Sequence, residues 1–298
     1  YDAMFDIAAG DMDGDGYDEI AVYTANQVYV YSYKNNILSK DIEHGVTHMG
    51  SSNGDPKYKK LGTVVVTLAF GDLNADDKDE LVIAESMPYD SLYVDKGTVG
   101  IYALDGKDLK KEWSTDLKDG STLIRYANVA TGDIDRNYKN ELVIAGYYSD
   151  NNRTATCKKD KFYYKIVKFE NNAYTDSGWG QTNQEIDLLQ RVVDNSYQLI
   201  PPVSLTCAAT QGVGYAEQVF LGGCLYTVNS DNSLKYLTRI STNREYKKDD
   251  GKKANKEEIF VVNVVAGNFN GNRYGQEQII YAFGMKHDDS DRYWYDIG

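Results

Sequence analysis

The apolar positions of this chain are gathered in short runs rich in β-branched residues. Residues 20–23 (Ile-Ala-Val-Tyr) and 81–84 (Leu-Val-Ile-Ala) are two such runs, and they suit strands better than helices. Residues 28–33 alternate valine with tyrosine or serine, which is the period of a half-buried strand. Residues 63–70 form a longer apolar run, typical of a buried strand. The pattern predicts an all-β fold with helix only as short turns.

A loop of alternating acidic residues precedes the first of these runs, with glycines between the acids. Acids spaced by two on a tight loop direct oxygens at one centre, and Ca²⁺ prefers six to eight oxygen ligands. The alternative is a solvated acidic turn without a metal. The predicted calcium ligands are Asp11, Asp13, Asp15, the main-chain carbonyl of Tyr17, and Glu19, with water completing the shell.

The loop recurs at a nearly fixed interval. The acids that close its first three copies, Glu19, Glu80 and Glu141, are 61 residues apart. A weaker copy ends at Glu277, and a copy that has lost the acidic ladder ends at Glu217. Self-similarity at such a period indicates a repeat architecture. The predicted repeats of this single domain are residues 1–60, 61–120, 121–195, 196–255 and 256–298.

The second and third loops offer the same kinds of ligand as the first. The second predicted site consists of Asp72, Asn74, Asp76, the Lys78 carbonyl and Glu80. The third predicted site consists of Asp133, Asp135, Asn137, the Lys139 carbonyl and Glu141. About three Ca²⁺ sites are therefore expected. Because the number of charged ligands tunes calcium affinity, the copy at Glu277 should bind weakly or not at all, and the copy at Glu217 should be empty.

The element after each loop distinguishes two kinds of calcium site. An EF-hand loop has its bidentate acid at position 12 and is followed by a helix. Here the acid is at position nine and a strand is expected after it. The arrangement resembles the FG-GAP or VCBS repeat of integrin α-subunit heads and bacterial surface proteins, and Phe70-Gly71 keep the Phe-Gly of that name. The resemblance implies a β-propeller with one blade per repeat and calcium loops joining the first and second strands of a blade.

The repeat count leaves the size of the propeller open. Five blades are visible, so the chain forms either a compact five-bladed ring or part of a seven- or eight-bladed ring. In the second case, other domains of a longer chain are expected as neighbours. The same resemblance implies a bacterial-type surface or secreted protein.

The net charge of −13 narrows the choice of partner. Three bound Ca²⁺ ions would bring it to about −7, and the remaining negative charge argues against nucleic acid or an anionic membrane as partner. No signal peptide or membrane-spanning segment is visible in the sequence, so membrane insertion is not expected. Calcium loops of modest charge match the high calcium concentration outside cells, so an extracellular or cell-surface location is expected.

Three residue types allow two interpretations each. The 26 tyrosines suit strands and cross-strand pairs, and exposed ones would also suit sugar recognition. Cys207 and Cys224 flank the repeat without an acidic ladder, where either a disulfide or two buried thiols would fit. His44 and His48 could share a metal on a helix, but the β-branched residues between them make a helix improbable.

No catalytic constellation stands out, because the clustered acids are already assigned to calcium. The expected function is a non-catalytic binding or adhesion module with an extracellular protein or a glycan as ligand. One alternative is a purely structural spacer of a larger surface protein. The other is a polysaccharide lyase or hydrolase, whose candidate basic residues are Arg125, Arg136, Lys139 and Arg153.

Overall fold

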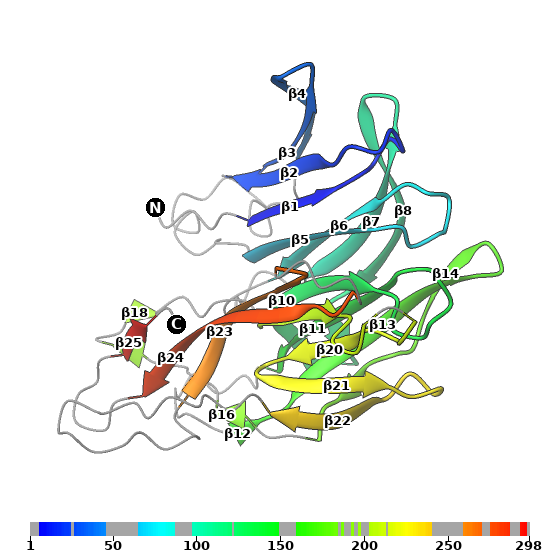
Figure 1. Cartoon of the computed structure of the whole chain (residues 1–298). Coiled ribbons are helices and arrows are strands. Elements are labelled where there is room, and N and C mark those ends of the chain that lie inside the picture. The colour runs from blue at the N-terminus through cyan, green and yellow to red at the C-terminus, as the bar shows by residue number, and fades with distance from the viewer. Residues whose placement is uncertain are drawn as a thin grey trace.

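The computed structural model describes residues 6–24, 27–45, 65–86, 97–120, 122–148, 159–183, 186–187, 192–193, 196–197, 203–212, 214–239, 259–269, 275–286 and 293–296. All regular secondary structure in these residues is β-strand, which confirms the all-β prediction (Figure 1). Within the same ranges, no helix has the length and apolar character needed to cross a membrane.

Five of the sheets correspond to the five predicted blades. Blade 1 contains β1 (Asp6–Gly10), β2 (Glu19–Thr24), β3 (Gln27–Lys34) and β4 (Ile37–Gly45). Blade 2 contains β5 (Val65–Gly71), β6 (Glu80–Ser86), β7 (Thr98–Asp105) and β8 (Asp108–Asp116). Blade 3 contains β9 (Lys118–Asp119), β10 (Thr122–Gly132), β11 (Glu141–Tyr148), β13 (Phe162–Glu170), β14 (Ala173–Asp176) and β15 (Gly180–Gln181).

The remaining strands complete the last two blades and two short pairs. Blade 4 contains β19 (Leu205–Ala208), β20 (Gln218–Leu221), β21 (Cys224–Val228) and β22 (Leu234–Arg239). Blade 5 contains β23 (Ile259–Gly267), β24 (Gln278–Lys286) and β25 (Tyr293–Asp296). The short pairs are β12 (Lys159–Asp160) with β16 (Ile186–Asp187), and β17 (Val192–Val193) with β18 (Ser196–Tyr197).

The blades are arranged side by side through their first strands. β1 lies against β5, β5 against β10, β10 against β19, and β19 against β23. Within the described blades all strand pairings are antiparallel, and the chain runs outward from β1, β5, β10, β19 and β23 (Figure 1). This is the arrangement of a β-propeller, with the first strand of each blade innermost.

The apolar core consists of three layers, each lying between consecutive blades. The layer between blades 1 and 2 contains Ala21 and Leu68, and the layer between blades 2 and 3 contains Val82 and Val129. A third layer joins blades 3 and 4. A blade with neighbours on both sides buries both faces of its sheet, which explains why β6 is buried along its whole length. In β2 buried and half-buried residues alternate, as in a strand with one covered face.

Two-residue hairpins whose residues both have positive φ connect β3 to β4 and β13 to β14. Asn35 and Asn36 have φ of 55° and 62°, and Asn171 and Asn172 have φ of 52° and 62°. Two left-handed residues in succession form a type I′ turn, whose twist matches that of the flanking strands. Asn35-Asn36 therefore form the turn between β3 and β4, and Asn171-Asn172 form the turn between β13 and β14.

A reciprocal pair of hydrogen bonds, here called the inter-blade clasp, ties blade 2 to blade 1. The Asp79 N–H donates to the Asp11 carbonyl at 2.8 Å, and the Asp11 N–H donates to Asp79 Oδ2 at 3.0 Å. The main-chain half of the clasp recurs at the next three junctions. Its pairs are Asn140 N–H to Asp72 O (3.1 Å), Glu217 N–H to Asp133 O (2.9 Å) and Glu277 N–H to Ala209 O (3.1 Å).

The glycine before each of the first three clasps is required by the close approach of the next blade. A Cβ on Gly10 would lie 2.4 Å from the Cβ of Phe70 and 2.6 Å from Asp79 Oδ2. A Cβ on Gly71 would lie 2.8 Å from the Cβ of Thr131. The Gly-Asp step at the start of each loop is therefore a packing requirement as well as a loop signal.

We predict that Gly10→Ala lowers the free energy of unfolding by about 1–3 kcal/mol, because the added methyl group must force blades 1 and 2 apart. The matched control is Gly45→Ala at the end of β4, where an added Cβ meets no atom within 4 Å. It should change the same quantity by about 0.5 kcal/mol or less. Urea unfolding in calcium buffer measures both, and equal effects would contradict the packing argument.

Candidate metal centres

Three loops join the first and second strands of blades 1 to 3, and the first acid organises each loop. These are loop 1 (residues 11–18), loop 2 (72–79) and loop 3 (133–140). The Asp11 carboxylate accepts hydrogen bonds from the N–H groups of Gly14 (2.8 Å), Asp15 (3.1 Å) and Gly16 (2.8 Å). Asp72 and Asp133 accept equivalent bonds from their own loops. The loops therefore share one backbone shape.

That shape needs two left-handed residues in each loop. Loop 1 has Gly14 and Gly16 there, at φ of 74° and 86°. Loop 2 has Ala75 and Asp77 (61° and 63°), and loop 3 has Arg136 and Tyr138 (69° and 65°). A residue with a Cβ pays about 1–2 kcal/mol in this region. Loops 2 and 3 keep the conformation despite that cost, so hydrogen bonds or a bound ion must offset it.

The closing glutamate, which begins the second strand of each of these blades, is almost fully buried. Glu19, Glu80 and Glu141 are 5%, 2% and 1% exposed. One carboxylate oxygen of each accepts an N–H bond from its loop, at 3.0 Å from Met12, 2.9 Å from Leu73 and 3.0 Å from Ile134. The glutamate therefore connects the loop to the start of the next strand.

The hydrogen-bond partner of the second carboxylate oxygen of each closing glutamate differs among the loops, and it bears on whether a cation fits. In loops 2 and 3 it accepts a hydrogen bond from the side-chain amide of Asn74 (2.7 Å) or Asn137 (3.1 Å). In loop 1 the Oε1 atom of Glu19 is buried and has no hydrogen-bond partner. A buried carboxylate oxygen without a partner is costly, and a cation among hard oxygen donors would satisfy it.

The acids of these loops converge closely enough to share an ion. Oxygens of Asp11, Asp13 and Asp15 all lie within 4.8 Å of one another. The third loop brings together Asp133, Asp135 and Glu141 within the same limit. Loop 2 has the same hydrogen-bond framework, with Asn74 in place of the second acid. These acidic clusters could hold a metal ion, and oxygen donors of this kind suit Ca²⁺.

Burial raises the pKa of the closing glutamates. The pKa of Glu80 rises to about 8 and that of Glu141 to about 7, mainly through burial, with repulsion from Asp76 or Asp135 adding to the shift. The pKa of Glu19 also rises, chiefly through burial and then through Asp13. A proton therefore competes with a metal ion for these carboxylates near neutral pH.

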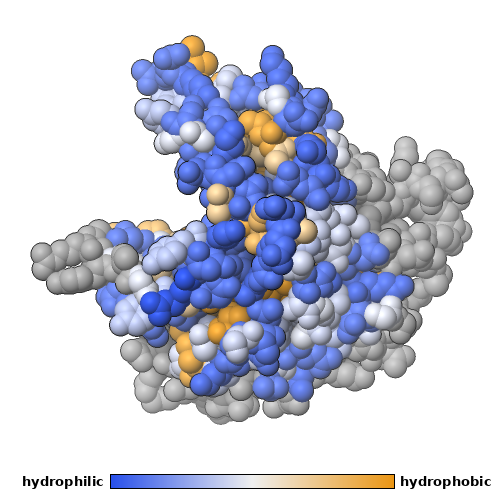
Figure 2. Space-filling model, turned by 90° about the vertical axis from the view of Figure 1, so that its right-hand side faces the viewer, coloured by the Kyte–Doolittle hydropathy of each residue, from blue (hydrophilic) through white to orange (hydrophobic). Residues whose placement is uncertain are grey.

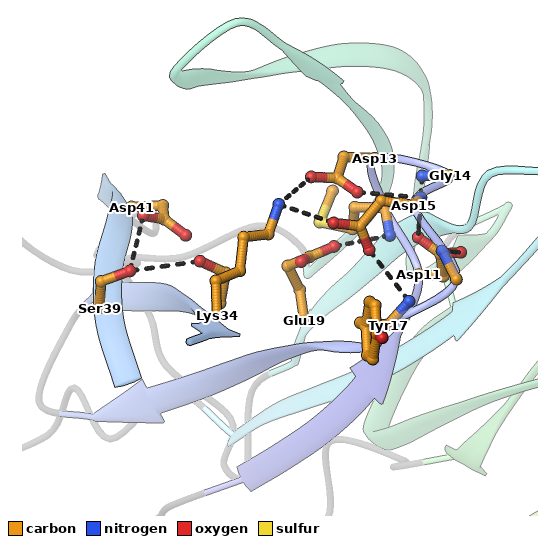
Figure 3. A network of polar contacts seen from close by, with 12 residues as sticks. Asp11, Asp13, Gly14, Asp15, Tyr17, Glu19, Lys34, Ser39 and Asp41 are labelled. Carbon is orange, nitrogen blue, oxygen red and sulfur yellow. Dashed lines mark hydrogen bonds and ion pairs between the residues drawn. The ribbon is translucent and has the colours of Figure 1, made fainter. Parts of the chain in front are cut away.

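A lysine ammonium lies directly beside the acids of loop 1. Lys34 Nζ is 2.8 Å from Asp13 Oδ2 and 2.8 Å from Asp15 Oδ2, and its side chain reaches across from β3 (Figure 3). These hydrogen bonds raise the pKa of Lys34 further. In loop 3, Lys168 Nζ lies 2.7 Å from Asp135 Oδ2. At two of the three predicted sites, a lysine ammonium of the protein therefore contacts the oxygens that would bind the metal ion.

Blades 4 and 5 correct the prediction that Glu217 and Glu277 close their loops. The strand register pairs Ala208 with Gln218 and Gly267 with Gln278, where blades 1 to 3 pair glycine with the closing glutamate. The loop of blade 4 has one residue more than loops 1 to 3 and the loop of blade 5 has two more, and in both the glutamate occupies the clasp position held by Asp79 in blade 2. The glutamine after each glutamate was the sequence signal that could have shown this.

Loop 4 (residues 209–217) closes without a charged ligand. Gln218 is 3% exposed, accepts a hydrogen bond from the Thr210 hydroxyl, and donates to the Ala216 carbonyl at 2.6 Å. Glu217 instead lies near Glu277, and burial together with that neighbour raises its pKa to about 7. The expectation of an empty fourth site stays a prediction, now supported by an amide at the closing position.

Other sequence candidates lie apart from these loops. Cys207 and Cys224 are buried free thiols, so the disulfide interpretation is wrong. His44 packs edge-on against Tyr102, with ring centroids 5.1 Å apart, and burial lowers its pKa. Arg125 is 2% exposed and lies near the start of β10. Arg136 and Lys139 lie in loop 3, which follows the other end of that strand. His48, Arg153 and Cys157 lie outside the described residues.

Figure 2 shows the side of the molecule that carries loops 1 to 3, which lie at the right of Figure 1. That side is mainly hydrophilic, with small apolar areas in the recesses between the blades. Exposed loop residues account for the polar character of this side.

Comparisons with known proteins agree with this fold. Residues 5–31 match the family model described as FG-GAP repeat. No curated protein matches the sequence. Among solved structures, rhamnogalacturonan lyase YesW is similar over 99% of this chain and 49% of that chain, with 12% identity and a TM-score of 0.51. The chain thus spans about half the length of that structure.

Two further structures show weaker likeness. The rhamnogalacturonan lyase PL11 of Bacillus licheniformis is 12% identical over 99% of this chain and 49% of its own, with a TM-score of 0.46. A protein from Lactobacillus plantarum is 13% identical over 97% of this chain and 82% of its own, with a TM-score of 0.41.

We predict that the stabilisation by calcium grows as the pH rises from 5 to 8. In the metal-free protein, protonated Glu80 and Glu141 favour folding below pH 4.5, and that contribution is lost as the pH rises through about 7–8. Calcium binds the ionised carboxylates, and a ligand at a hundredfold excess over Kd adds about 2.7 kcal/mol per site. Thermal melts with calcium or EDTA at each pH measure the difference.

The matched variant for this experiment is Glu80→Gln, which removes one titrating carboxylate and one ligand charge. It should flatten the pH dependence of the EDTA melt and narrow the difference between the two melts. If EDTA leaves the melting temperature unchanged at pH 8 but abolishes ligand binding, the ions bridge to a ligand and do not stabilise the fold.

We predict that Lys34→Met tightens calcium binding at the first site by about two- to fivefold. The ion must displace an ammonium that contacts two ligand carboxylates, and the gain is modest because these ion pairs are exposed to solvent. Calorimetric titration measures the affinity. Lys168→Met, which acts on loop 3, is the control: it should leave the first site unchanged. Weaker binding in Lys34→Met would show that the lysine supports the site.

Proposed function

We propose that this chain, an FG-GAP β-propeller, is an extracellular calcium-stabilised binding module whose ligand is a neutral glycan. In this proposal three Ca²⁺ ions are structural. Each is held by the side chains of one loop, the carbonyl of Tyr17, Lys78 or Lys139, and the closing glutamate. The ion fixes the loop and the start of the next strand together, and the loops present the ligand-binding surface.

Exposed aromatic rings on the loops are the observation that carries the proposal. The side chains of Tyr17 in loop 1, Tyr138 in loop 3 and Tyr215 in loop 4 are 69%, 91% and 57% exposed. All three lie between the first and second strands of their blades and therefore at the same end of the propeller. A tyrosine ring stacks on a sugar face while its hydroxyl forms hydrogen bonds, so a row of such rings suits a glycan.

The charge of this end favours a neutral ligand. The tyrosines stand among the acids of loops 1 and 3, and the chain carries a net charge of −13. A field of one sign repels polymers of the same sign and attracts those of the opposite sign. A polyanionic glycan would therefore bind against repulsion unless the calcium ions compensated for it.

Polysaccharide cleavage is the second candidate, because the fold is similar to that of rhamnogalacturonan lyase YesW. A shared fold does not carry a shared activity. Among the basic residues proposed for a lyase, buried Arg125 lies far from Arg136 and Lys139 along blade 3. The candidate bases that the structure describes therefore do not form one group, which favours binding without cleavage.

We predict that Tyr17→Ala and Tyr138→Ala each weaken glycan binding about two- to tenfold, the loss expected for one aromatic contact. Both substitutions keep the main chain, so calcium binding should not change. Tyr236→Ala on the outer strand β22, where the ring is 39% exposed, is the matched control and should bind normally. A neutral and acidic glycan array followed by calorimetry measures the effect.

The same samples should be incubated with acidic polysaccharides while the absorbance of unsaturated products is followed. A steady increase in that absorbance would establish a lyase and overturn the proposal. Absence of both binding and cleavage would exclude glycans and direct attention to a protein ligand.

A further inference from the structure

Blade 1 exposes an apolar position that every later blade buries. The position lies three residues before the end of each innermost strand, and in blade 1 it is Ile7, which is 66% exposed. The equivalent residues are Leu68 (7%), Val129 (4%), Leu205 (5%) and Val264 (8%). All five are branched apolar residues, so the difference in exposed fraction comes from what covers the side chain.

Blade 5 shows the same contrast on its opposite face. Ile280 is the third residue of β24 and is 49% exposed. The third residues of the second strands in the first four blades are all 0% exposed: Ala21, Val82, Val143 and Phe220.

A second position on that face of blade 5 agrees. Phe269, two residues after the end of β23, is 56% exposed. Its equivalents in blades 1 to 3 are Met12, Leu73 and Ile134, which are 1–2% exposed. Blade 5 therefore carries two large apolar side chains in the open at positions that the first three blades bury.

The interior junctions show what covers these positions. Leu68 of blade 2 packs in one layer with Met12 and Ala21 of blade 1. The same three positions meet in the layer between blades 2 and 3 and in the layer between blades 3 and 4. The position of Ile7 is thus covered by a preceding blade, and the positions of Phe269 and Ile280 by a following blade.

We propose that further blades of the same repeat, carried by the same polypeptide beyond residues 1–298, cover the free face of blade 1 and the free face of blade 5. Continuity supports the same polypeptide, because every described junction joins blades that are consecutive in sequence. The likeness to a longer structure, of which this chain spans 49%, fits an arc that is part of a larger β-fold. Apolar side chains left open at both ends would otherwise form adhesive patches.

The proposal also specifies the covering blades. The blade before blade 1 must carry apolar residues at the positions of Met12 and Ala21. The blade after blade 5 must carry a branched apolar residue at the position of Ile7. At the position of Asp79 it must carry an acid or an amide, as Asp79, Asn140, Glu217 and Glu277 do in the described blades.

The test uses the protein made from its complete natural reading frame. Ile7→Asp and Ile280→Asp place a charge at the two faces, Leu68→Asp does so inside a known layer, and Leu38→Asp does so at an exposed site on β4 (56%). We expect the first three to lower the melting temperature by at least about 5 °C and Leu38→Asp to lower it by about 1 °C or less. If the Asp variants do not fold, threonine at the same positions should give the same order.

Two results would overturn the proposal. If Ile7→Asp and Ile280→Asp are as harmless as Leu38→Asp, these faces are free in the whole protein. If the protein sediments as an oligomer that either substitution dissociates, a second copy covers the faces instead of further blades.

Discussion

The architecture of blades 1 to 3 depends on a carboxylate that is buried at the first residue of the second strand. Glu19, Glu80 and Glu141 each bind back to an N–H group of their own loop, so the loop and the following strand are fixed by one side chain. A carboxylate in that position is unfavourable by itself, because burial disfavours its charge and the neighbouring acids repel it. A proton, an amide donor or a cation can compensate for the buried charge. In loops 2 and 3 an asparagine amide donates to the glutamate, whereas in loop 1 the Oε1 atom of Glu19 has no hydrogen-bond partner.

The same loops also hold the blades together. Asp11 directs its side chain into loop 1 and uses its main chain in the clasp with Asp79 of blade 2. Asp72 and Asp133 have the same double role at the next two junctions. Each predicted metal site therefore lies at a junction between blades, and any ion that orders a loop also orders the contact with the next blade.

Local features of this fold could be predicted from the sequence, and contacts between blades could not. The spacing of Asp11, Asp13 and Asp15 and the apolar runs predicted the loops and the strands after them, and the resemblance to FG-GAP repeats predicted the propeller. The clasp was not predicted, because Asp79 stands in an acidic loop where it is not distinguished from the other acids, and its partner Asp11 is 68 residues away in the sequence. The Lys34 contact was missed because it depends on where β3 ends beside loop 1.

Blade 4 shows why a repeat can lose its ligands and keep its place in the fold. Once Gln218 closes loop 4 through Thr210 and Ala216, no buried charge has to be compensated. Glu217 occupies the clasp position instead, where its N–H donates to the Asp133 carbonyl of blade 3 at 2.9 Å. At the following junction the Glu277 carboxylate accepts the Ala209 N–H at 2.7 Å, restoring both halves of the clasp. Because these hydrogen bonds join blade 4 to blade 5 without an acidic ladder in loop 4, the succession of blades does not require a predicted metal site in every blade.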